Sequence, residues 1–391
     1  MTLRILITGG GTGGHAVPAI ATARAIQQQL AGDEPAFLYV GSLTGVEGRL
    51  AAEAGIPFKG VRTGKLRRAS NPFRMVSRAN IADMFRIPLG VAEAADAVRR
   101  FQPDVVFSTG GYVSVPAVLA ASTRGIPVVA HEQTVQIGLA NKIIMPRAKV
   151  VALSYPESAT ELQPAVRKRS KVTGNPVRDG IFGGDPARGK AWAGFDDADD
   201  ALPTVYVTGG AQGSRMLNVA IDGCLPALLD HCRIIHQCGK QPGDSQDIDT
   251  LHATASTLPD HIKRRYFVTQ YVGPEIADVY ALASLIVGRS GAGTVSEVCA
   301  LGKAALFVPL VPTGGDEQTR NAKRVSDMGG AVLLPQADLS SDSIRDAITR
   351  LVTDPNRLIA MGDASRKLAM PTAAQDLAKL VIDTAKGASK P

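Results

Sequence analysis

The chain carries two glycine-rich turns, one in each half, and each turn closes an apolar strand and opens a helical pattern. Residues 5–8 (Ile-Leu-Ile-Thr) lead into residues 9–15 (Gly-Gly-Gly-Thr-Gly-Gly-His), and residues 205–208 (Val-Tyr-Val-Thr) lead into residues 209–214 (Gly-Gly-Ala-Gln-Gly-Ser). Glycine permits positive φ and lets backbone amides approach a ligand closely, and the N-terminus of the following helix favours negative charge. The repeated arrangement predicts two similar α/β domains with an anion site at their cleft.

Chain length and element order support this interpretation. A chain of 391 residues is too long for one ordinary core, and strand-like runs alternate with helical stretches. We expect strands at residues 3–8, 36–41, 105–108, 127–131, 150–154, 204–208, 233–238, 266–269, 285–288 and 304–309. We expect helices at residues 18–30, 45–54, 91–101, 115–123, 216–229, 276–283, 294–301, 318–328 and 373–384. The alternation predicts an α/β protein with two doubly wound parallel sheets. The expected domains are residues 1–175 and 176–368, with a final helix in 369–391 that returns to the first domain.

No metal or cofactor is expected. The four cysteines are too few for a disulfide scaffold and indicate reduced thiols. Cys232, His236 and Cys238 lack the C-x-x-C spacing typical of zinc sites. Two Asp-x-Asp pairs, at 197–199 and 247–249, fall in acidic loops, and we interpret them as surface charge. The first glycine turn is not a dinucleotide site, because the second strand lacks the acidic residue that such sites place at its end.

The positive charge is concentrated in one segment. The chain has a net charge of +7, and residues 59–86 carry eight basic side chains and one acid, with apolar residues between them. A solvated charged face and a nucleic-acid surface are alternatives, but aromatic residues for base stacking are scarce. The composition favours an anionic membrane surface. The expected patch consists of Arg67, Arg68, Phe73, Arg74, Arg78, Ile81, Met84 and Phe85. Since neither a leader peptide nor a membrane-spanning run is evident, we expect a cytoplasmic protein.

Polar residues follow the strands of the first half. His15 stands at a helix start, where a positive helix end disfavours the imidazolium, so it is a candidate general base; a capping role is the alternative. Residues 110–114 (Gly-Gly-Tyr-Val-Ser) and 131–134 (His-Glu-Gln-Thr) follow two further strands. Parallel strands bring their carboxyl ends to one crevice, so these three clusters predict one site.

The second half has a sharper element. Residues 288–297 (Gly-Arg-Ser-Gly-Ala-Gly-Thr-Val-Ser-Glu) predict a strand end, a tight turn and a helix start. Amides near 291–294 suit a phosphate or a uracil edge, and Glu297 suits two ribose hydroxyls; the alternative is an acid that stabilises the helix dipole. Residues 316–322 (Asp-Glu-Gln-Thr-Arg-Asn-Ala) start another helix with groups suited to sugar hydroxyls.

Taken together, these segments resemble the MurG family of bacterial UDP-N-acetylglucosamine transferases. The resemblance runs nearly end to end, over residues 9–15, 110–114, 131–133, 174–178, 209–213, 218, 289–297 and 316–322. It implies a GT-B fold and an inverting transfer of GlcNAc from UDP-GlcNAc to the C4 hydroxyl of the muramyl sugar of undecaprenyl-linked lipid I. The product, lipid II, serves peptidoglycan synthesis, cell shape and cell division. The implied partners are UDP-GlcNAc, lipid I, the anionic inner-membrane surface at its cytoplasmic face and other cell-wall synthesis proteins, but not nucleic acid.

The resemblance also implies roles for individual residues, with His15 or a nearby base taking the acceptor proton, or with His15 only binding the acceptor. The implied donor-binding residues are Thr12, Gly13, Gly14, Thr134, Arg178, Ala211, Gln212, Gly213, Asn218, Ser290, Gly291, Ala292, Gly293, Thr294, Glu297, Gln318 and Asn321. The implied acceptor-binding residues are Gly10, Gly11, Gly110, Gly111, Tyr112, His131 and Glu132. No metal is required by this design, because amides and helix ends stabilise the leaving phosphate.

Two positions depart from the family pattern. Thr134 stands where the family usually has Asn, and Ala211 stands where it often has Ser. Three other functions remain open from the residues alone: a glycosyltransferase with another acceptor, a UDP-GlcNAc epimerase, and a non-catalytic nucleotide-sugar-binding subunit.

Overall fold

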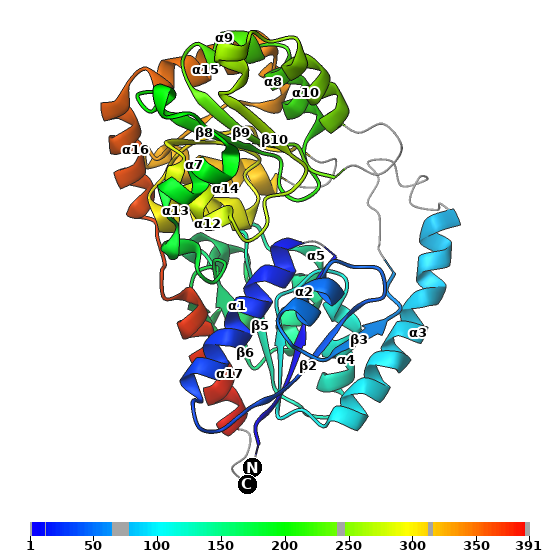
Figure 1. Ribbon diagram of the computed structural model, residues 1–391. Helices are drawn as coiled ribbons and strands as arrows, with labels where there is room; N and C mark the ends of the chain where they lie inside the picture. Colours follow the sequence, from blue (N-terminus) through cyan, green and yellow to red (C-terminus); the bar gives the residue numbers. More distant parts are fainter. Residues whose placement is uncertain (1, 12, 65–77, 241–246, 312–315, 388–391) are drawn as a thin grey trace. The chain divides into compact units, whose positions relative to one another are not determined.

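The computed structural model describes residues 2–11, 13–64, 78–240, 247–311 and 316–387, and they form two compact units (Figure 1). Unit 1 comprises mainly residues up to 178 together with those from 370 onward, and unit 2 comprises mainly residues 179–311 and 318–369. Each unit is described below by itself.

Unit 1 is built on a parallel sheet with the strand order β3-β2-β1-β4-β5-β6-β7. Its strands are β1 (Arg4–Thr8), β2 (Ala36–Ser42), β3 (Phe58–Val61), β4 (Val105–Ser108), β5 (Val128–Glu132), β6 (Val150–Leu153) and β7 (Ser170–Val172). Its helices are α1 (Gly13–Gln29), α2 (Glu47–Glu53), α3 (Arg78–Phe101), α4 (Ser114–Ser122), α5 (Leu139–Ile144), α6 (Pro164–Arg167) and α17 (Ala373–Lys386).

The side chains of β1 point alternately to the two faces of the sheet, and this shows which helices of unit 1 cover each face. Ile5 and Ile7 pack in a core with α1 and α17, whereas Leu6 packs in a core with α3, α4 and α5. Successive strand side chains point to opposite faces, so the buried residues 5–8 of β1 require helices on both sides of the sheet. Helix α17 lies along α1 and completes one of these layers (Figure 1).

Unit 2 repeats the design with the strand order β10-β9-β8-β11-β12-β13. Its strands are β8 (Thr204–Thr208), β9 (Arg233–Gln237), β10 (Tyr266–Thr269), β11 (Leu285–Gly288), β12 (Ala304–Phe307) and β13 (Ala331–Leu333). Its helices are α7 (Pro186–Ala193), α8 (Arg215–Asp222), α9 (Leu225–Leu229), α10 (Asp247–Ser256), α11 (Asp260–Lys263), α12 (Ile276–Leu282), α13 (Ala292–Leu301), α14 (Glu317–Asp327), α15 (Ser341–Val352) and α16 (Pro355–Arg366).

The α/β class and the parallel sheets are confirmed, and some expected boundaries are wrong. The single helix expected at 216–229 is two helices, α8 and α9, and Pro226 near the start of α9 supplies no amide to continue the ladder. The helix expected from residue 91 begins at Arg78, and the helix expected from residue 18 begins at Gly13. Strands β3, β7 and β13 were not expected; each is a short strand of three or four residues.

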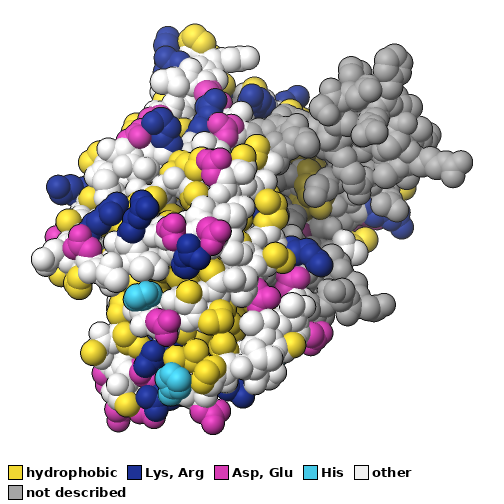
Figure 2. All heavy atoms as spheres, turned by 90° about the horizontal axis from the view of Figure 1, so that it is seen from above, with side chains coloured by type: hydrophobic (Ala, Val, Ile, Leu, Met, Phe, Trp, Pro, Cys, Tyr) yellow, Lys and Arg dark blue, Asp and Glu magenta, His cyan; other side chains and the backbone are white. Residues whose placement is uncertain are grey.

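The described surface mixes charges of both signs. On the face shown in Figure 2, basic, acidic and apolar side chains are interspersed. Within the described ranges, no helix is both long and apolar enough to cross a membrane.

Candidate active site

The strand order of each sheet defines where a ligand site belongs. In unit 1 the order reverses between the neighbouring strands β1 and β4, and in unit 2 it reverses between β8 and β11. Doubly wound sheets bind ligands beyond the carboxyl ends of the strands at such switch points. The turn after β1 leads into α1, whose third residue is His15, and the turn after β4 contains residues 109–112. The turns after β8 and β11 contain residues 209–214 and 289–291, and α13 begins at Ala292. Both glycine turns, His15 and residues 109–112 therefore fall at the two switch points, whereas residues 131–134 lie at the end of β5 and residues 316–322 lie between β12 and β13.

Thr109, which directly follows β4, holds His15 at two points. The His15 Nδ1 lies 2.9 Å from the Thr109 carbonyl oxygen, and the Thr109 hydroxyl donates to the His15 carbonyl at 2.8 Å. A carbonyl oxygen only accepts, so Nδ1 carries a proton, and in the neutral ring Nε2 holds the lone pair. This is the tautomer that a general base requires. The imidazole is partly exposed.

Glycines 10, 11, 110 and 111 are required by packing within unit 1. A Cβ at Gly11 would lie 2.7 Å from the Tyr112 ring, and one at Gly111 would lie 2.3 Å from the Gly10 carbonyl oxygen. Gly11 and both glycines after Thr109 also have positive φ. A Cβ at Gly13, at the start of α1, would meet no atom within 4 Å. In the first glycine turn, Gly10 and Gly11 therefore allow close packing against neighbouring residues, whereas Gly13 faces open space.

A buried carboxylate supports the first glycine turn. Glu47, at the start of α2, is fully buried, and its carboxylate accepts from the Ser42 amide at 2.8 Å and from the Gly11 amide at 3.4 Å. A Cβ at Gly10 or Gly45 would come within 2.6 Å of this carboxyl group. Sequence reasoning missed Glu47, because no local pattern distinguishes it from an ordinary acid in a first helical turn.

His131 and Gln133 extend the network around Thr109. The His131 Nε2 lies 3.0 Å from the Gly174 carbonyl oxygen, and the Gln133 amide nitrogen lies 3.4 Å from His131 Nδ1 and 2.5 Å from the Thr109 carbonyl oxygen. Burial lowers the pKa of His131 from 6.5 to about 4, so the ring is neutral. The ring is fully buried, which gives it a positioning role, and direct contact with an acceptor stays a prediction.

Glu132 organises the loop that follows β5. Its carboxylate accepts from the Thr134 hydroxyl and the Asn141 amide, both at 2.9 Å, and from the Gly138 amide, also at 2.9 Å. Glu132 and Thr134 are both buried. Thr134, the departure noted above, therefore bonds within its own loop. Contacts of these two residues with substrates remain predictions.

The second glycine turn, in unit 2, interlocks with the loop after β9 and also presents exposed positions. A Cβ at Gly213 would lie 1.9 Å from the Cys238 carbonyl oxygen, whereas one at Gly210 would meet no atom within 4 Å. Ala211 and Gln212 are exposed at the tip of the turn. The tip is therefore open to a ligand, while Gly213 is fixed by packing.

The turn after β11 connects to α14. The Ser290 hydroxyl donates to the Gln318 carbonyl oxygen at 2.8 Å, and the buried Asn321 amide donates to the Ser290 carbonyl oxygen at 3.3 Å. Helix α13 then begins at Ala292, with Gly291 before it and Gly293 in its first turn, and a Cβ at either glycine would meet no atom within 4 Å. The amides of this helix start, including that of Thr294, suit an anion.

Arg289 and Glu297 place charges beside this helix start. Arg289 is nearly buried and donates to the Ser214 hydroxyl and to the Val308 carbonyl oxygen, both at 3.0 Å, and burial lowers its pKa. Glu297, in the second turn of α13, is 3% exposed and accepts from the Tyr280 hydroxyl at 2.9 Å. The unit thus holds a cation next to the glycine turn and a carboxylate further along the helix.

Asn218 is the centre of a buried network. Its amide donates to Asp247 at 2.8 Å and to the Cys238 carbonyl oxygen at 2.9 Å, and its oxygen lies 3.0 Å from His236 Nε2. Burial lowers the pKa of His236 to about 3. The interpretation of Asp247 as surface charge is wrong, because this carboxylate is largely buried and bonded.

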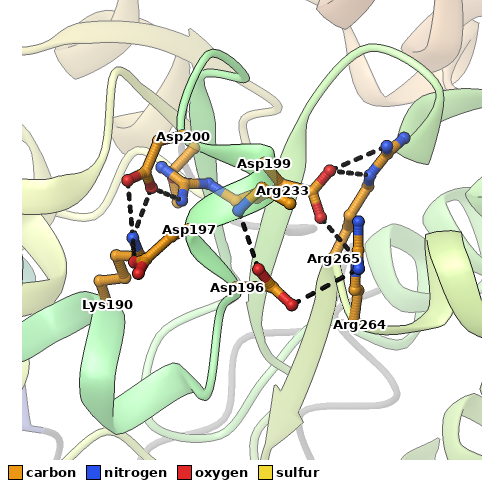
Figure 3. A network of polar contacts seen from close by, with 10 residues as sticks. Lys190, Asp196, Asp197, Asp199, Asp200, Arg233, Arg264 and Arg265 are labelled. Atoms are coloured by element: carbon orange, nitrogen blue, oxygen red, sulfur yellow. Dashed lines mark hydrogen bonds and ion pairs between the residues drawn. The ribbon is translucent and has the colours of Figure 1, made fainter.

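The other acidic pair belongs to an ion-pair network in unit 2 that links α7, β9 and residues 196–200 to residues 264 and 265 (Figure 3). Asp199 is buried and pairs with Arg264 at 2.9 Å and Arg265 at 2.8 Å, so reading it as surface charge is also wrong. Asp200 bridges Lys190 and Arg233, and these bonds lower its pKa. Among the described residues, no group of three His, Cys, Asp or Glu side chains is arranged to hold a metal.

The remaining predicted site residues lie partly outside the described residues and partly at exposed or half-buried positions. Thr12 and the patch residues Arg67, Arg68, Phe73 and Arg74 lie outside the described residues. Arg78, Ile81, Met84 and Phe85 fall on α3, but their side chains are not described. Arg178 is partly exposed at the end of unit 1, and Gly14 is exposed in the first turn of α1.

Two Rossmann-like units with glycine turns at their switch points form a GT-B type fold, and the comparisons with known proteins identify the class as a glycosyltransferase. Residues 5–153 match the glycosyltransferase family 28 N-terminal domain, and residues 204–377 match its C-terminal domain. A UDP-N-acetylglucosamine–N-acetylmuramyl-(pentapeptide) pyrophosphoryl-undecaprenol N-acetylglucosamine transferase of Lachnospira eligens is 34% identical over 91% of this chain and 93% of its own. The transferase of the same name from a Nocardioides species is 36% identical over 99% of this chain and all of its own.

A solved structure shows the same similarity to MurG transferases. The crystal structure of Acinetobacter baumannii MurG is 28% identical, with a TM-score of 0.70 over 97% of this chain and 99% of that chain. The chain belongs to the MurG family of N-acetylglucosamine transferases.

Proposed function

We propose that this chain transfers GlcNAc from UDP-GlcNAc to the C4 hydroxyl of the MurNAc sugar of undecaprenyl-linked lipid I, giving lipid II. The printed names of its relatives supply the donor, the lipid-linked acceptor and the transferred group. The observation that carries the proposal is the bond from His15 Nδ1 to the Thr109 carbonyl, which leaves Nε2 as a base at the switch point of unit 1.

Unit 2 is proposed to hold the donor. The amides of residues 291–294 at the start of α13 and those of residues 210–212 would meet the diphosphate, because helix starts and glycine turns favour anions. Glu297 would accept hydrogen bonds from the two ribose hydroxyls, and Gln318 would meet the sugar. Arg289, which is bonded to Ser214 and Val308, adds positive charge next to the second glycine turn.

Unit 1 is proposed to hold the acceptor and the base. His15 Nε2 takes the proton of the C4 hydroxyl while that oxygen attacks the anomeric carbon of GlcNAc. The bond from this carbon to the β-phosphate oxygen breaks, UDP leaves with the electron pair, and the configuration inverts. Tyr112, Gly110 and Gly111 would line the acceptor side, and donor amides would stabilise the charge on the leaving phosphate.

The protein is proposed to work as a peripheral protein at the cytoplasmic face of the membrane. The acceptor named for its relatives is lipid-linked, and the excess positive charge lies in residues 59–86. Basic residues near an anionic surface contribute about 1 kcal/mol each. Roles in cell shape and cell division, and contacts with other cell-wall synthesis proteins, follow from the same proposal.

The test is a product analysis of the purified chain. The chain is incubated with radiolabelled UDP-GlcNAc, with and without lipid I, and the mixture is separated into lipid and water-soluble products. We expect label in the lipid fraction only when lipid I is present. Label that appears in UDP-ManNAc would instead identify an epimerase, and label that stays in UDP-GlcNAc under all conditions would support a binding subunit.

A further inference from the structure

We propose that Tyr280 is a positioning residue that orients Glu297 for the ribose, and that this pair sets the preference of the donor site for ribonucleotides over 2′-deoxyribonucleotides. The inference rests on the proposed function, because it assumes that Glu297 meets the ribose. It adds a residue that belongs to neither glycine turn and lies on another helix, α12.

The contact itself is short and enclosed. The Tyr280 hydroxyl donates to Glu297 Oε2 at 2.9 Å, and the two residues are 2% and 3% exposed. A hydrogen bond to an ionised acceptor is stronger than one between neutral groups, and enclosure from water strengthens it further. The phenol also adds no positive charge, so the carboxylate remains a strong acceptor for additional hydroxyl groups.

The phenol is in turn held by its surroundings. The rings of Tyr280 and Tyr206 meet edge to face, with centroids 5.6 Å apart and planes at 79°. Tyr206 lies on the central strand β8, and its hydroxyl donates to Gln237 on β9 at 3.2 Å. Such aromatic pairs have a preferred geometry, so the sheet fixes the phenol and the phenol fixes one carboxylate oxygen.

A fixed carboxylate matters for a ligand with two adjacent hydroxyls. The 2′ and 3′ hydroxyls of ribose bind one carboxylate well only when its two oxygens are held at the right angle. A carboxylate that rotates must lose that freedom when the ligand binds, and this ordering weakens affinity. Removing the Tyr280 hydroxyl should therefore weaken UDP more than 2′-deoxy-UDP, which offers one hydroxyl fewer.

The experiment is a calorimetric titration of the whole chain with UDP and with 2′-deoxy-UDP. The variants are Tyr280→Phe, Glu297→Ala and the double variant. For Tyr280→Phe we expect UDP affinity to fall about threefold to tenfold, the range of one hydrogen bond, with a smaller fall for 2′-deoxy-UDP. In the double variant we expect no further loss beyond Glu297→Ala, because the phenol acts through the carboxylate.

The matched control is Tyr266→Phe, which removes a hydroxyl bonded to His236 at 2.9 Å in the same unit. Its ratio of UDP to 2′-deoxy-UDP affinity should equal that of the unmodified chain. If Glu297→Ala leaves UDP affinity unchanged, the ribose assignment of the proposed function is wrong. A second outcome overturns only the role of Tyr280. In that outcome Glu297→Ala weakens UDP binding, but Tyr280→Phe leaves the ratio of UDP affinity to 2′-deoxy-UDP affinity unchanged, whether Glu297 is present or replaced by Ala.

Discussion

His131 should make unit 1 sensitive to acid. Its imidazole has no exposed surface and is held by Gly174 and Gln133, and burial lowers its pKa from 6.5 to about 4. The unfolded chain therefore binds a proton at a higher pH than the folded chain does. Between these two pKa values, protonation favours the unfolded state, so stability is fully present above pH 6.5 and falls as the pH falls toward 4.

The size of the effect follows from the two pKa values. One pKa unit corresponds to about 1.4 kcal/mol, so the full loss below pH 4 is about 3 kcal/mol. At pH 5 about 2 kcal/mol of it is already lost, according to the same linkage. A typical domain is stable by only about 5–15 kcal/mol, so this loss should be easy to measure.

The assay compares the unmodified chain with His131→Gln by guanidinium unfolding at pH 7.5 and pH 5. Trp192, the single tryptophan, lies in unit 2, so circular dichroism is needed to follow unit 1. His131→Gln lowers the free energy of unfolding at both pH values through lost packing. The free energy that this variant loses between pH 7.5 and pH 5 should, however, be smaller than the loss in the unmodified chain by about 2 kcal/mol. Because His236 in unit 2 acts in the same direction, only this difference is assigned to His131.

The control is His252→Gln, which replaces an exposed histidine and should leave the pH dependence unchanged. If His131→Gln and the unmodified chain lose equal stability between the two pH values, the imidazole is protonated as readily in the folded state as in the unfolded one. Burial would then not hold the His131 imidazole neutral, and its positioning role would be excluded.

Three further predictions concern catalysis and the membrane. His15→Ala should lower kcat by about 10²–10⁴ with UDP affinity retained, and near-normal turnover would make the imidazole structural. EDTA should leave transfer intact, since amides and cations meet the leaving charge; loss that Mg²⁺ or Mn²⁺ restores would contradict this. Replacing Arg67, Arg68, Arg74 and Arg78 with Ser should release the protein from anionic vesicles, as measured by flotation, while transfer to a short, water-soluble lipid I analogue survives. Continued flotation at physiological salt would exclude this segment as the docking surface.

The parallel sheets were predictable because their signals are local. Apolar runs such as residues 204–208 end in glycine turns, and the structure has β8 at these residues. The short strands at the sheet edges were not predictable, because a strand of three residues such as Ser170–Val172 is too short to show a recognisable hydrophobic pattern. The break between α8 and α9 was missed although Pro226 marks it, because the apolar spacing continues across it.

The candidate site was predictable at the turns and not at the contacts behind them. His15 directly follows Gly14, and Glu297 lies four residues after Gly293, so their positions follow from the chain itself. Thr109, Glu47 and Tyr280 act from other strands and helices, through contacts that only the folded units create. Asp199 and Asp247 were misread for the same reason, because their cationic and amide partners are distant in sequence, whereas Asp197 and Asp249 are exposed as expected.

The structure of the product tests the proposed transfer directly. The purified chain is incubated with ¹³C-labelled UDP-GlcNAc and a soluble lipid I analogue, and the lipid product is examined by NMR. We predict a labelled GlcNAc in β-linkage to the C4 oxygen of MurNAc, formed by the unmodified chain and strongly reduced in His15→Ala. An α-linked product, a linkage to another hydroxyl, or release of UDP with no disaccharide would contradict an inverting transfer by this site.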